Sequence, residues 1–140
     1  MAVAGYLADK SALARLHHPL VAARLGPLVE AGLVATCPMV ELEVLFSTRS
    51  RKEYEVVRAD RRLGYEWLPM AEQEWERALE VQRDLAAVGQ LRAVAIPDLL
   101  IAATAERHRV TVLHYDADFD RIASVTGQPV EWAVPAGAVS

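Results

Sequence analysis

Acidic side chains stand at four places along the chain where they could together bind a cation. They are Asp9, Glu43, Asp98 and the pair Asp116 and Asp118. Carboxylates held close together repel one another, and burial makes each negative charge more costly still, so a cluster of this size indicates a bound cation. Oxygen ligands favour Mg²⁺ or Mn²⁺, whereas zinc prefers His or Cys. The residue types therefore predict a centre for a hard divalent metal.

Each of these acids also has an ordinary structural interpretation. Asp98 follows Pro97 and could serve only to begin a helix, where an acid favours the first turn. Asp9 could be a turn residue and Glu43 a surface glutamate on a charged helix. The acids from Asp116 onward could be the solvated start of another helix. Position favours a shared site, because each acid lies next to the end of a predicted strand or opens the following helix.

Short apolar segments alternate with helical patterns, and these elements must position the acids. Strands are expected at residues 3–8, 32–37, 64–68, 110–115 and 130–134, and helices at 11–17, 19–30, 40–62, 71–88, 98–109 and 116–126. Strands alternating with helices imply a parallel sheet covered on both faces, an α/β doubly wound sandwich. Ligands of such sheets bind beyond the carboxyl ends of the strands. No linker or repeat interrupts the pattern, so we expect one domain over residues 1–140.

Two of the predicted helices carry apolar residues spaced for a buried face. In and just after 40–62 these include Val44, Val56 and Leu63. In 71–88 the corresponding residues are Trp75, Ala78, Leu79, Leu85 and Ala86. We expect both helices to pack with these side chains toward the core.

The composition is that of a globular domain large enough to have its own core. The chain has 140 residues, of which 53% are hydrophobic and 24% charged. Charged residues interrupt the apolar stretches, so no membrane span is expected, and no secretory signal is evident at the start. Cys37 is the single cysteine, which makes an internal disulfide impossible and fits the reducing cytoplasm.

The net charge of −4 argues at first against a nucleic-acid partner, because such surfaces are usually basic. Without the five candidate ligands, however, 14 of the 19 acidic residues remain against 15 basic ones, a balance of +1. Much of the acidity could belong to a metal site that attracts phosphate once it holds a cation. The charge therefore does not exclude nucleic acid, and it predicts binding that depends on metal.

Four segments give the chain a family resemblance over essentially its whole length. They are Tyr6-Leu7-Ala8-Asp9-Lys10-Ser11, Leu42-Glu43-Val44-Leu45, Pro97-Asp98-Leu99-Leu100-Ile101-Ala102-Ala103 and Leu113-His114-Tyr115-Asp116-Ala117-Asp118-Phe119. With them the chain resembles the PIN-domain ribonucleases, and most closely the VapC toxins of bacterial toxin–antitoxin pairs. The last two segments, in this order and spacing, are the most specific.

The resemblance implies a PIN-like α/β/α sandwich with a central, mainly parallel sheet. It also implies a site in which Asp9, Glu43, Asp98 and Asp116 are the catalytic and metal-binding quartet. By the same resemblance Asp118 is an accessory ligand and Ser11 a supporting hydroxyl. Glu41 and Glu43 are two positions apart and point about 200° apart on a helix, so only one can join the site. We choose Glu43, because the family's glutamate is followed by apolar residues that lead into its helix.

An activity and two kinds of partner follow from the resemblance. The family uses Mg²⁺ or Mn²⁺ and a metal-activated water to cut RNA. Hard cations suit this reaction, because they neutralise the phosphodiester, lower the pKa of a bound water and stabilise the leaving oxygen. The resemblance further implies a homodimer, and a small VapB-like antitoxin with a segment that blocks the acidic groove, often with a basic side chain.

Basic and aromatic residues outside the acidic cluster offer weaker candidates. Arg92, in the loop that leads to Asp98, could hold a phosphate of the substrate. Arg58 and Arg62 share a helix face and could do the same, although a solvated surface paired with Glu53 and Glu55 is the ordinary interpretation. His114 lies two residues before Asp116 on one side of a strand, and we expect it to be a partly buried structural residue.

Two other functions compete with a toxin nuclease. A receiver-like phosphoacceptor module shares the length, the α/β class and the clustered acids, but it would want paired acids after the first strand and a lysine near the last. Here Asp9 stands alone and no lysine follows Lys52. A catalytically inactive PIN-like binding domain is disfavoured because all four expected acids are present. Neither GxGxxG nor GxxxxGK[ST] occurs, which excludes the common dinucleotide and P-loop sites.

Overall fold

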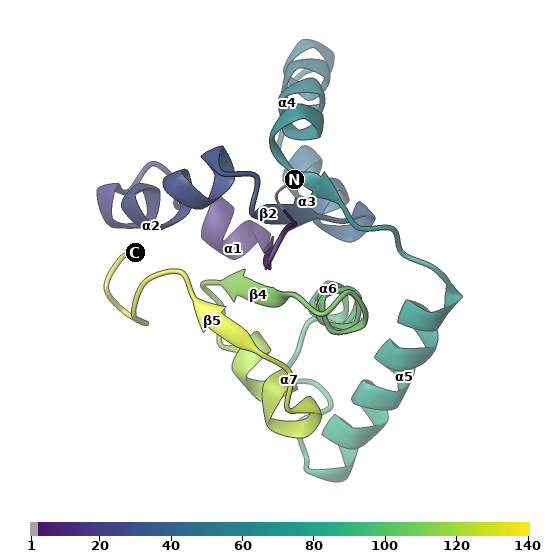
Figure 1. The fold of residues 1–140 in the computed structure, drawn as a ribbon. Helices are drawn as coiled ribbons and strands as arrows, with labels where there is room; N and C mark the ends of the chain where they lie inside the picture. Colours follow the sequence, from purple (N-terminus) through teal and green to yellow (C-terminus); the bar gives the residue numbers. More distant parts are fainter. Residues whose placement is uncertain (1–2) are drawn as a thin grey trace.

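A five-stranded parallel sheet forms the centre of the protein in a computed structural model that describes residues 3–140 (Figure 1). The strands are β1 (Tyr6–Ala8), β2 (Val34–Thr36), β3 (Glu66–Trp67), β4 (Thr111–His114) and β5 (Val130–Trp132). Their spatial order is β3-β2-β1-β4-β5, and every neighbouring pair is parallel. This order differs from the 2-1-3-4-5 order of receiver modules. The five predicted strands are confirmed, each somewhat shorter than its apolar segment.

Helices cover both faces of this sheet. They are α1 (Lys10–Leu13), α2 (Pro19–Glu30), α3 (Pro38–Phe46), α4 (Arg51–Gly64), α5 (Glu72–Ala87), α6 (Ile96–Arg107) and α7 (Asp118–Thr126). Successive strand residues point to opposite faces, which divides the core in two. On one face Leu7 and Val112 lie in the cluster formed with α3, α5, α6 and α7, and on the other Leu113 packs with α1 and α2. The described helices include none with the length and apolar character needed to cross a membrane.

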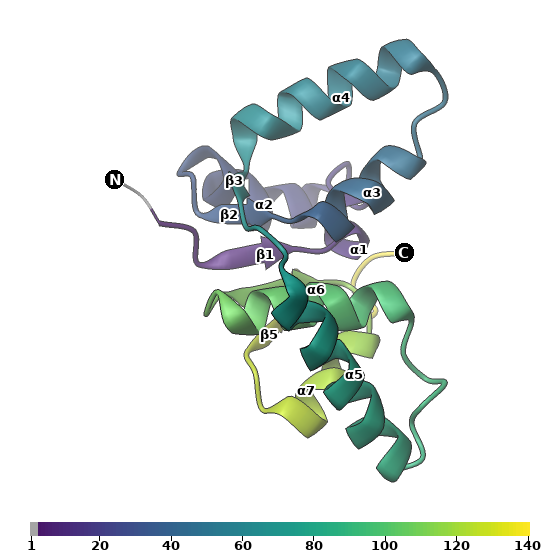
Figure 2. The ribbon, with the colours of Figure 1, turned by 90° about the vertical axis from the view of Figure 1, so that its right-hand side faces the viewer.

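The single helix predicted over 40–62 is wrong, because the chain breaks there into α3 and α4. The hydroxyls of Ser47 and Thr48 donate to the carbonyl oxygens of Val44 and Leu45 and help to end α3. Ser50 then caps α4, its hydroxyl accepting the backbone N–H of Glu53 at 3.1 Å. The result is a helical hairpin from which α4 extends beside the body of the domain (Figure 2).

Two predicted buried faces are also wrong in part. Val56 and Leu63 are exposed on α4, with 90% of Leu63 accessible, and Arg61 is the buried residue of that helix. On α5, Trp75 and Leu79 are exposed at 57% and 66%.

The face of α5 that packs inward overlaps the predicted one, because Ala78 and Leu85 are buried as predicted. Ala86 is exposed, and the buried residues of the helix are Glu74, Ala78, Val81 and Leu85. This stripe includes an acid, because Glu74 accepts hydrogen bonds from the backbone N–H of Ala71 (2.6 Å) and from Arg107 (2.8 Å). A buried carboxylate with such donors is tolerated. A search for apolar residues in the sequence does not find it, because glutamate is polar.

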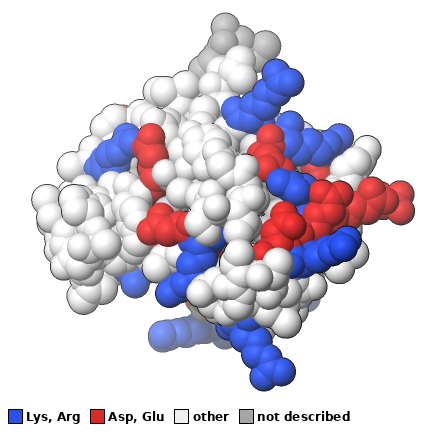
Figure 3. Space-filling model, turned by 90° about the horizontal axis from the view of Figure 1, so that it is seen from below, with Lys and Arg blue, Asp and Glu red and all other residues white. Residues whose placement is uncertain are grey.

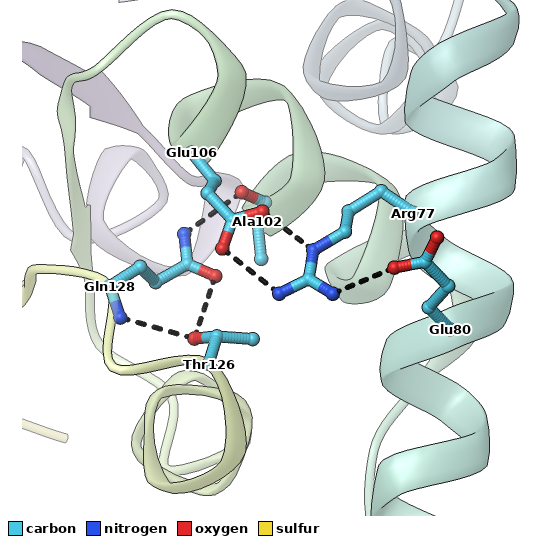
Figure 4. Close-up of polar contacts among 6 residues, drawn as sticks. All are labelled: Arg77, Glu80, Ala102, Glu106, Thr126 and Gln128. Carbon is cyan, nitrogen blue, oxygen red and sulfur yellow. Dashed lines mark hydrogen bonds and ion pairs between the residues drawn. The ribbon is translucent and has the colours of Figure 1, made fainter.

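Polar contacts hold α6 in place between its neighbours (Figure 4). Arg77 of α5 donates to Glu106 of α6 at 2.7 Å and also pairs with Glu80 at 3.0 Å. From the other side, the Gln128 amide donates to the Ala102 carbonyl oxygen at 2.9 Å. These contacts matter for the acidic cluster because Asp98 lies in the first turn of α6.

Candidate metal centre

Asp9 comes directly after β1, at the carboxyl edge of the sheet. Its backbone N–H donates to the Leu113 carbonyl oxygen at 2.9 Å, and one carboxylate oxygen caps α1 by accepting the Ser11 N–H at 3.0 Å. The other oxygen, Oδ1, is buried and has no hydrogen-bond partner. Burial raises the pKa of Asp9, and the nearby charge of Asp116 adds to this effect while hydrogen bonds from Ser11 oppose it.

Glu43 projects from α3 toward Asp9. Its Oε1 is also buried without a partner, and burial followed by the charge of Asp9 raises the pKa of Glu43. Glu41 faces elsewhere, since it accepts the Thr36 hydroxyl proton at 2.5 Å and the Arg61 Nε–H at 2.8 Å. Of the two glutamates on α3, the structure brings Glu43 to the cluster and pairs Glu41 with Arg61.

Asp98 is a buried residue in the first turn of α6. Ala95 is the residue that precedes the helix as its N-cap, and Asp98 Oδ2 is buried without a partner. Burial, with the neighbouring carboxylates of Asp9, Asp118 and Asp116 following in that order, raises the pKa of Asp98 to about 9. An acid that only began a helix would have no such neighbours, so the ordinary interpretation of Asp98 does not account for its surroundings.

Asp116 and Asp118 follow β4 and occupy a tight turn into α7. Asp116 Oδ1 accepts the Asp118 N–H at 2.9 Å. Asp118 in turn accepts the Ala95 N–H at 3.0 Å and an Arg121 N–H at 2.9 Å, so it ties α7 to the start of α6. Within residues 3–140 Asp116 thus has no arginine or lysine partner, whereas both oxygens of Asp118 already have donors.

The five acids form two overlapping groups at this edge. In the first, one carboxylate oxygen each from Asp9, Glu43 and Asp98 lie within 4.8 Å of one another. In the second, the same holds for Asp98, Asp116 and Asp118, so Asp98 belongs to both. Buried carboxylate oxygens without partners are costly, and within residues 3–140 each of the three acids of the first group has one. A donor set of oxygens only, with unsatisfied lone pairs, fits a hard divalent cation.

The remaining candidate residues lie outside these groups. The Ser11 hydroxyl accepts the Tyr115 N–H at 2.8 Å and so joins α1 to the end of β4. Arg92 is exposed in the loop between α5 and α6. Arg58 and Arg62 line a groove of about 720 Å³ on α4, and among the ion pairs of residues 3–140 neither is paired with Glu53 or Glu55. None of the five acids lines that groove.

Comparisons with known proteins agree with this arrangement. A family model for the PIN domain matches residues 6–125. Two curated relatives from Mycobacterium tuberculosis cover nearly the whole chain. Ribonuclease VapC21 is 48% identical over 132 residues, covering 94% of this chain and 96% of the relative, and ribonuclease VapC51 is 46% identical over 134 residues, covering 96% of each. The chain belongs to the VapC family of PIN-domain proteins.

Solved structures share the fold of this VapC-family chain. DNA-bound VapBC from Salmonella typhimurium superimposes with a TM-score of 0.75 at 14% identity, covering 94% of this chain and 100% of that chain. FitAcB from Neisseria gonorrhoeae gives a TM-score of 0.71 at 20% identity, covering 91% and 97%. The predicted PIN-like α/β/α sandwich is therefore confirmed.

Sequence reasoning missed one buried group at the site of this VapC-family chain. His114, expected to be partly buried, is fully buried, and its Nδ1 accepts the Asp116 N–H at 3.1 Å. Burial lowers the pKa of His114, opposed by the charges of Asp120 and Asp116. The feature of the sequence that could have indicated this contact is the place of His114 on β4, two residues before Asp116.

Proposed function

We propose that this chain, as one PIN domain over residues 1–140, is the toxin of a toxin–antitoxin pair and acts in the cytoplasm as a metal-dependent endoribonuclease. The observation that carries the proposal is the grouping of Asp9, Glu43 and Asp98, each of which has a buried carboxylate oxygen with no hydrogen-bond partner among residues 3–140. The names of the relatives, which are ribonucleases, support the reaction class. A site of this kind is a centre for Mg²⁺ or Mn²⁺ in a nuclease.

In this proposal Asp9, Glu43, Asp98 and Asp116 hold the metal, and Asp118 is an accessory ligand. A divalent ion bound there supplies positive charge to the scissile phosphodiester and a water of lowered pKa. The protein keeps its carboxylates in place through backbone donors, the Ser11 N–H on Asp9 and the Ala95 N–H on Asp118. The donors already engaged by Asp118 support its accessory role, and the membership of Asp98 in both groups makes it the central ligand.

The carboxylates of the metal-free centre repel one another, which supports the proposal that they bind a cation. The pKa of Asp98 rises to about 9, so this carboxyl holds a proton at neutral pH until a metal replaces it. Binding of metal therefore releases a proton. The same negative charge opposes RNA phosphates in the metal-free protein, and substrate binding near the cluster depends on metal.

We place the RNA backbone on arginines that have no carboxylate partner among the described residues. Arg58 and Arg62 border the groove on α4 together with Tyr54, Tyr65 and Trp67. Arginines contact phosphates, and aromatic faces stack on bases of single strands. Arg92 is a second candidate on the approach to α6. Acidic and basic side chains are intermixed on the face drawn in Figure 3, so that face of the described residues presents no continuous basic surface.

The structure has a second groove, beside α1, and an antitoxin is the partner that fits it best. The solved neighbours include VapBC toxin–antitoxin proteins, and this groove, of about 310 Å³, lies between α1, α3 and α4. It is lined in part by Lys10 and Val44, the residues next to Asp9 and Glu43. An apolar segment of a VapB-like antitoxin in this groove would bring a basic side chain within reach of the carboxylates and block them.

Exposed apolar side chains on α5 offer a surface for self-association. Trp75 and Leu79 are four residues apart on α5 and form an exposed apolar stripe. Large exposed apolar side chains in a row favour an interface over open solvent. We therefore place a homodimer contact on this side of α5.

The purified protein, free of antitoxin, is the material for the test. It should cleave RNA in Mg²⁺ or Mn²⁺, and EDTA should stop the reaction. Expression of the chain alone should arrest bacterial growth, and co-expression of a neighbouring short reading frame should relieve the arrest. Cleavage that persists in EDTA would contradict the metal centre, and unaffected growth would contradict the toxin role. An RNA-binding protein without cleavage in any metal would indicate the inactive PIN-like alternative.

A further inference from the structure

His114 ends β4 at the carboxyl edge of the sheet, with none of its side chain accessible. Its ring lies between Phe119 of α7 and Trp132 of β5, and each of the two centroid distances is 5.1 Å. These aromatic contacts come from two different elements, α7 and β5, which both follow the turn that carries Asp116. They fix the plane of the imidazole, and so fix where its nitrogens point.

The ring makes one hydrogen bond, and that bond is to the backbone of a candidate metal ligand. His114 Nδ1 lies 3.1 Å from the Asp116 backbone nitrogen. Because an amide N–H can only donate, Nδ1 must be the bare nitrogen and the proton of the neutral ring sits on Nε2. The charged imidazolium has no acceptor nitrogen and cannot make this contact.

A relay of three hydrogen bonds starts from that nitrogen. His114 Nδ1 accepts from the Asp116 N–H, Asp116 Oδ1 accepts from the Asp118 N–H at 2.9 Å, and Asp118 Oδ2 accepts from the Ala95 N–H at 3.0 Å. The relay runs from the end of β4 through the turn to the start of α6. It therefore links the strand to the helix that carries Asp98, and sets the position of the Asp116 carboxylate along the way.

The second ring nitrogen does not explain the presence of a histidine. His114 Nε2 is buried and has no hydrogen-bond partner in the part of the chain that the structure describes. The closest acid is Asp120, whose Oδ1 is 4.0 Å away, too far for a hydrogen bond, while its Oδ2 accepts the Trp132 Nε1–H at 2.9 Å. A phenylalanine would fill this space without a buried unpartnered polar atom. Packing alone thus does not account for the residue, and the acceptor at Nδ1 does.

We infer that His114 is a positioning residue of the metal centre, whose neutral, Nε2-protonated ring holds the Asp116 backbone so that the Asp116 carboxylate faces the cation. This role rests on the proposed metal centre. His114 itself touches neither metal nor RNA. It acts through Asp116, as groups behind metal ligands do when they orient the ligand.

Two substitutions separate the hydrogen bond from the packing. His114→Phe keeps the aromatic volume between Phe119 and Trp132 but removes the acceptor. His114→Asn loses the ring but can place an amide oxygen where Nδ1 stands. We expect Mn²⁺ affinity, measured by calorimetry, to fall by about 10-fold or more in His114→Phe, the size of effect typical of groups behind metal ligands. His114→Asn should recover most of that loss even if its melting temperature in EDTA is lower.

The control is His108, at the end of α6 that is far from Asp98. His108 Nε2 lies 3.0 Å from the Pro69 carbonyl oxygen, and His108→Phe should bind Mn²⁺ like the wild type. In the wild-type protein, NMR of the ring nitrogens should find the proton on Nε2 of His114 and a coupling between Nδ1 and the Asp116 amide. The inference is overturned if His114→Phe binds Mn²⁺ as tightly as the wild type, or if NMR finds the proton on Nδ1. A wild-type protein that binds no Mn²⁺ would overturn the proposed function as well.

Discussion

Glu41 and Glu43 lie two residues apart on α3, and their carboxylates reach different surroundings. Glu41 is bound by Arg61 and by the Thr36 hydroxyl, whereas Glu43 has a buried oxygen without a partner beside Asp9 and Asp98. The first has the environment of a structural ion pair, and the second that of a ligand without its cation. The two glutamates therefore make a matched pair for separating stability from metal binding.

Glu43→Gln should weaken Mn²⁺ binding by more than about tenfold, because it removes a charged oxygen from the site. The metal-free variant should unfold at the same temperature as the wild type or higher, since a carboxylate repelled by Asp9 is gone. Glu41→Gln should show the opposite pattern, with unchanged Mn²⁺ affinity and a loss of about 1–3 kcal/mol in stability from Arg61 left without its counter-charge. Calorimetry and thermal unfolding in EDTA measure both. Equal loss of affinity in the two variants would contradict the assignment of Glu43.

The metal-free protein should lose stability as pH rises. The folded pKa of Asp98 is about 9, while its ordinary value is 3.8. Below the ordinary value both folded and unfolded chains hold the proton. Above it the unfolded chain ionises first, so this contribution to stability declines from about pH 4 to about pH 9.

Asp98→Asn should remove that decline and raise the melting temperature of the protein in EDTA at pH 8. A gain of about 1 kcal/mol corresponds to roughly 3–4 °C for a domain of this size. Thermal unfolding followed by circular dichroism between pH 4 and 9 measures the effect. Asp60→Asn, at an exposed position of α4, is the control and should keep the wild-type profile. A pH profile of Asp98→Asn identical to the wild type would argue against the raised pKa.

The arginines of the α4 groove should affect RNA binding more than chemistry. Arg58→Gln combined with Arg62→Gln should raise KM for RNA cleavage severalfold with little change in kcat, because phosphate contacts act on binding. The slope of log affinity against log salt concentration should become shallower, by the amount expected for the loss of about one to two phosphate contacts. Arg83→Gln, another exposed arginine on α5, should leave KM unchanged. A fall in kcat at constant KM would place these arginines in a different role.

The exposed apolar stripe on α5 predicts the state of association. Leu79→Glu should convert a homodimer into a monomer, because a charge in an apolar interface cannot be paired. Light scattering coupled to gel filtration measures the mass. Leu20→Glu, at an exposed position of α2, should remain dimeric. A wild-type protein that is monomeric at all concentrations would contradict the homodimer, and a dimeric Leu79→Glu would place its interface elsewhere.

Local sequence patterns were enough to predict the strands and to gather the acids. The strands lie within short segments rich in apolar residues, and parallel strands bring the residues that follow them to one edge of the sheet. Asp9 and Asp116 could therefore be assigned to the same edge from the sequence. Helix spacing indicated that only one of Glu41 and Glu43 could join the site, and the family resemblance favoured Glu43, which the structure has in the cluster.

The remaining features depend on contacts that a local pattern does not contain. The break between α3 and α4 comes from hydroxyls of Ser47 and Thr48 that bond to the backbone, in a stretch whose spacing otherwise suits one helix. The buried stripe of α5 is set by Arg107, which satisfies Glu74 from another helix. The full burial of His114 similarly requires Phe119 and Trp132 to arrive from two different elements.

Mn²⁺ binding by the Asp98→Asn variant is the decisive test of the proposed metal centre, since Asp98 belongs to both groups of carboxylates. Calorimetry on the wild-type protein at neutral pH should show Mn²⁺ binding with release of a proton. Asp98→Asn should bind no Mn²⁺ in the same range, while its circular dichroism spectrum stays that of the folded protein. Wild-type Mn²⁺ affinity in Asp98→Asn would contradict the proposed metal centre, because the cation would then lie outside the carboxylate cluster.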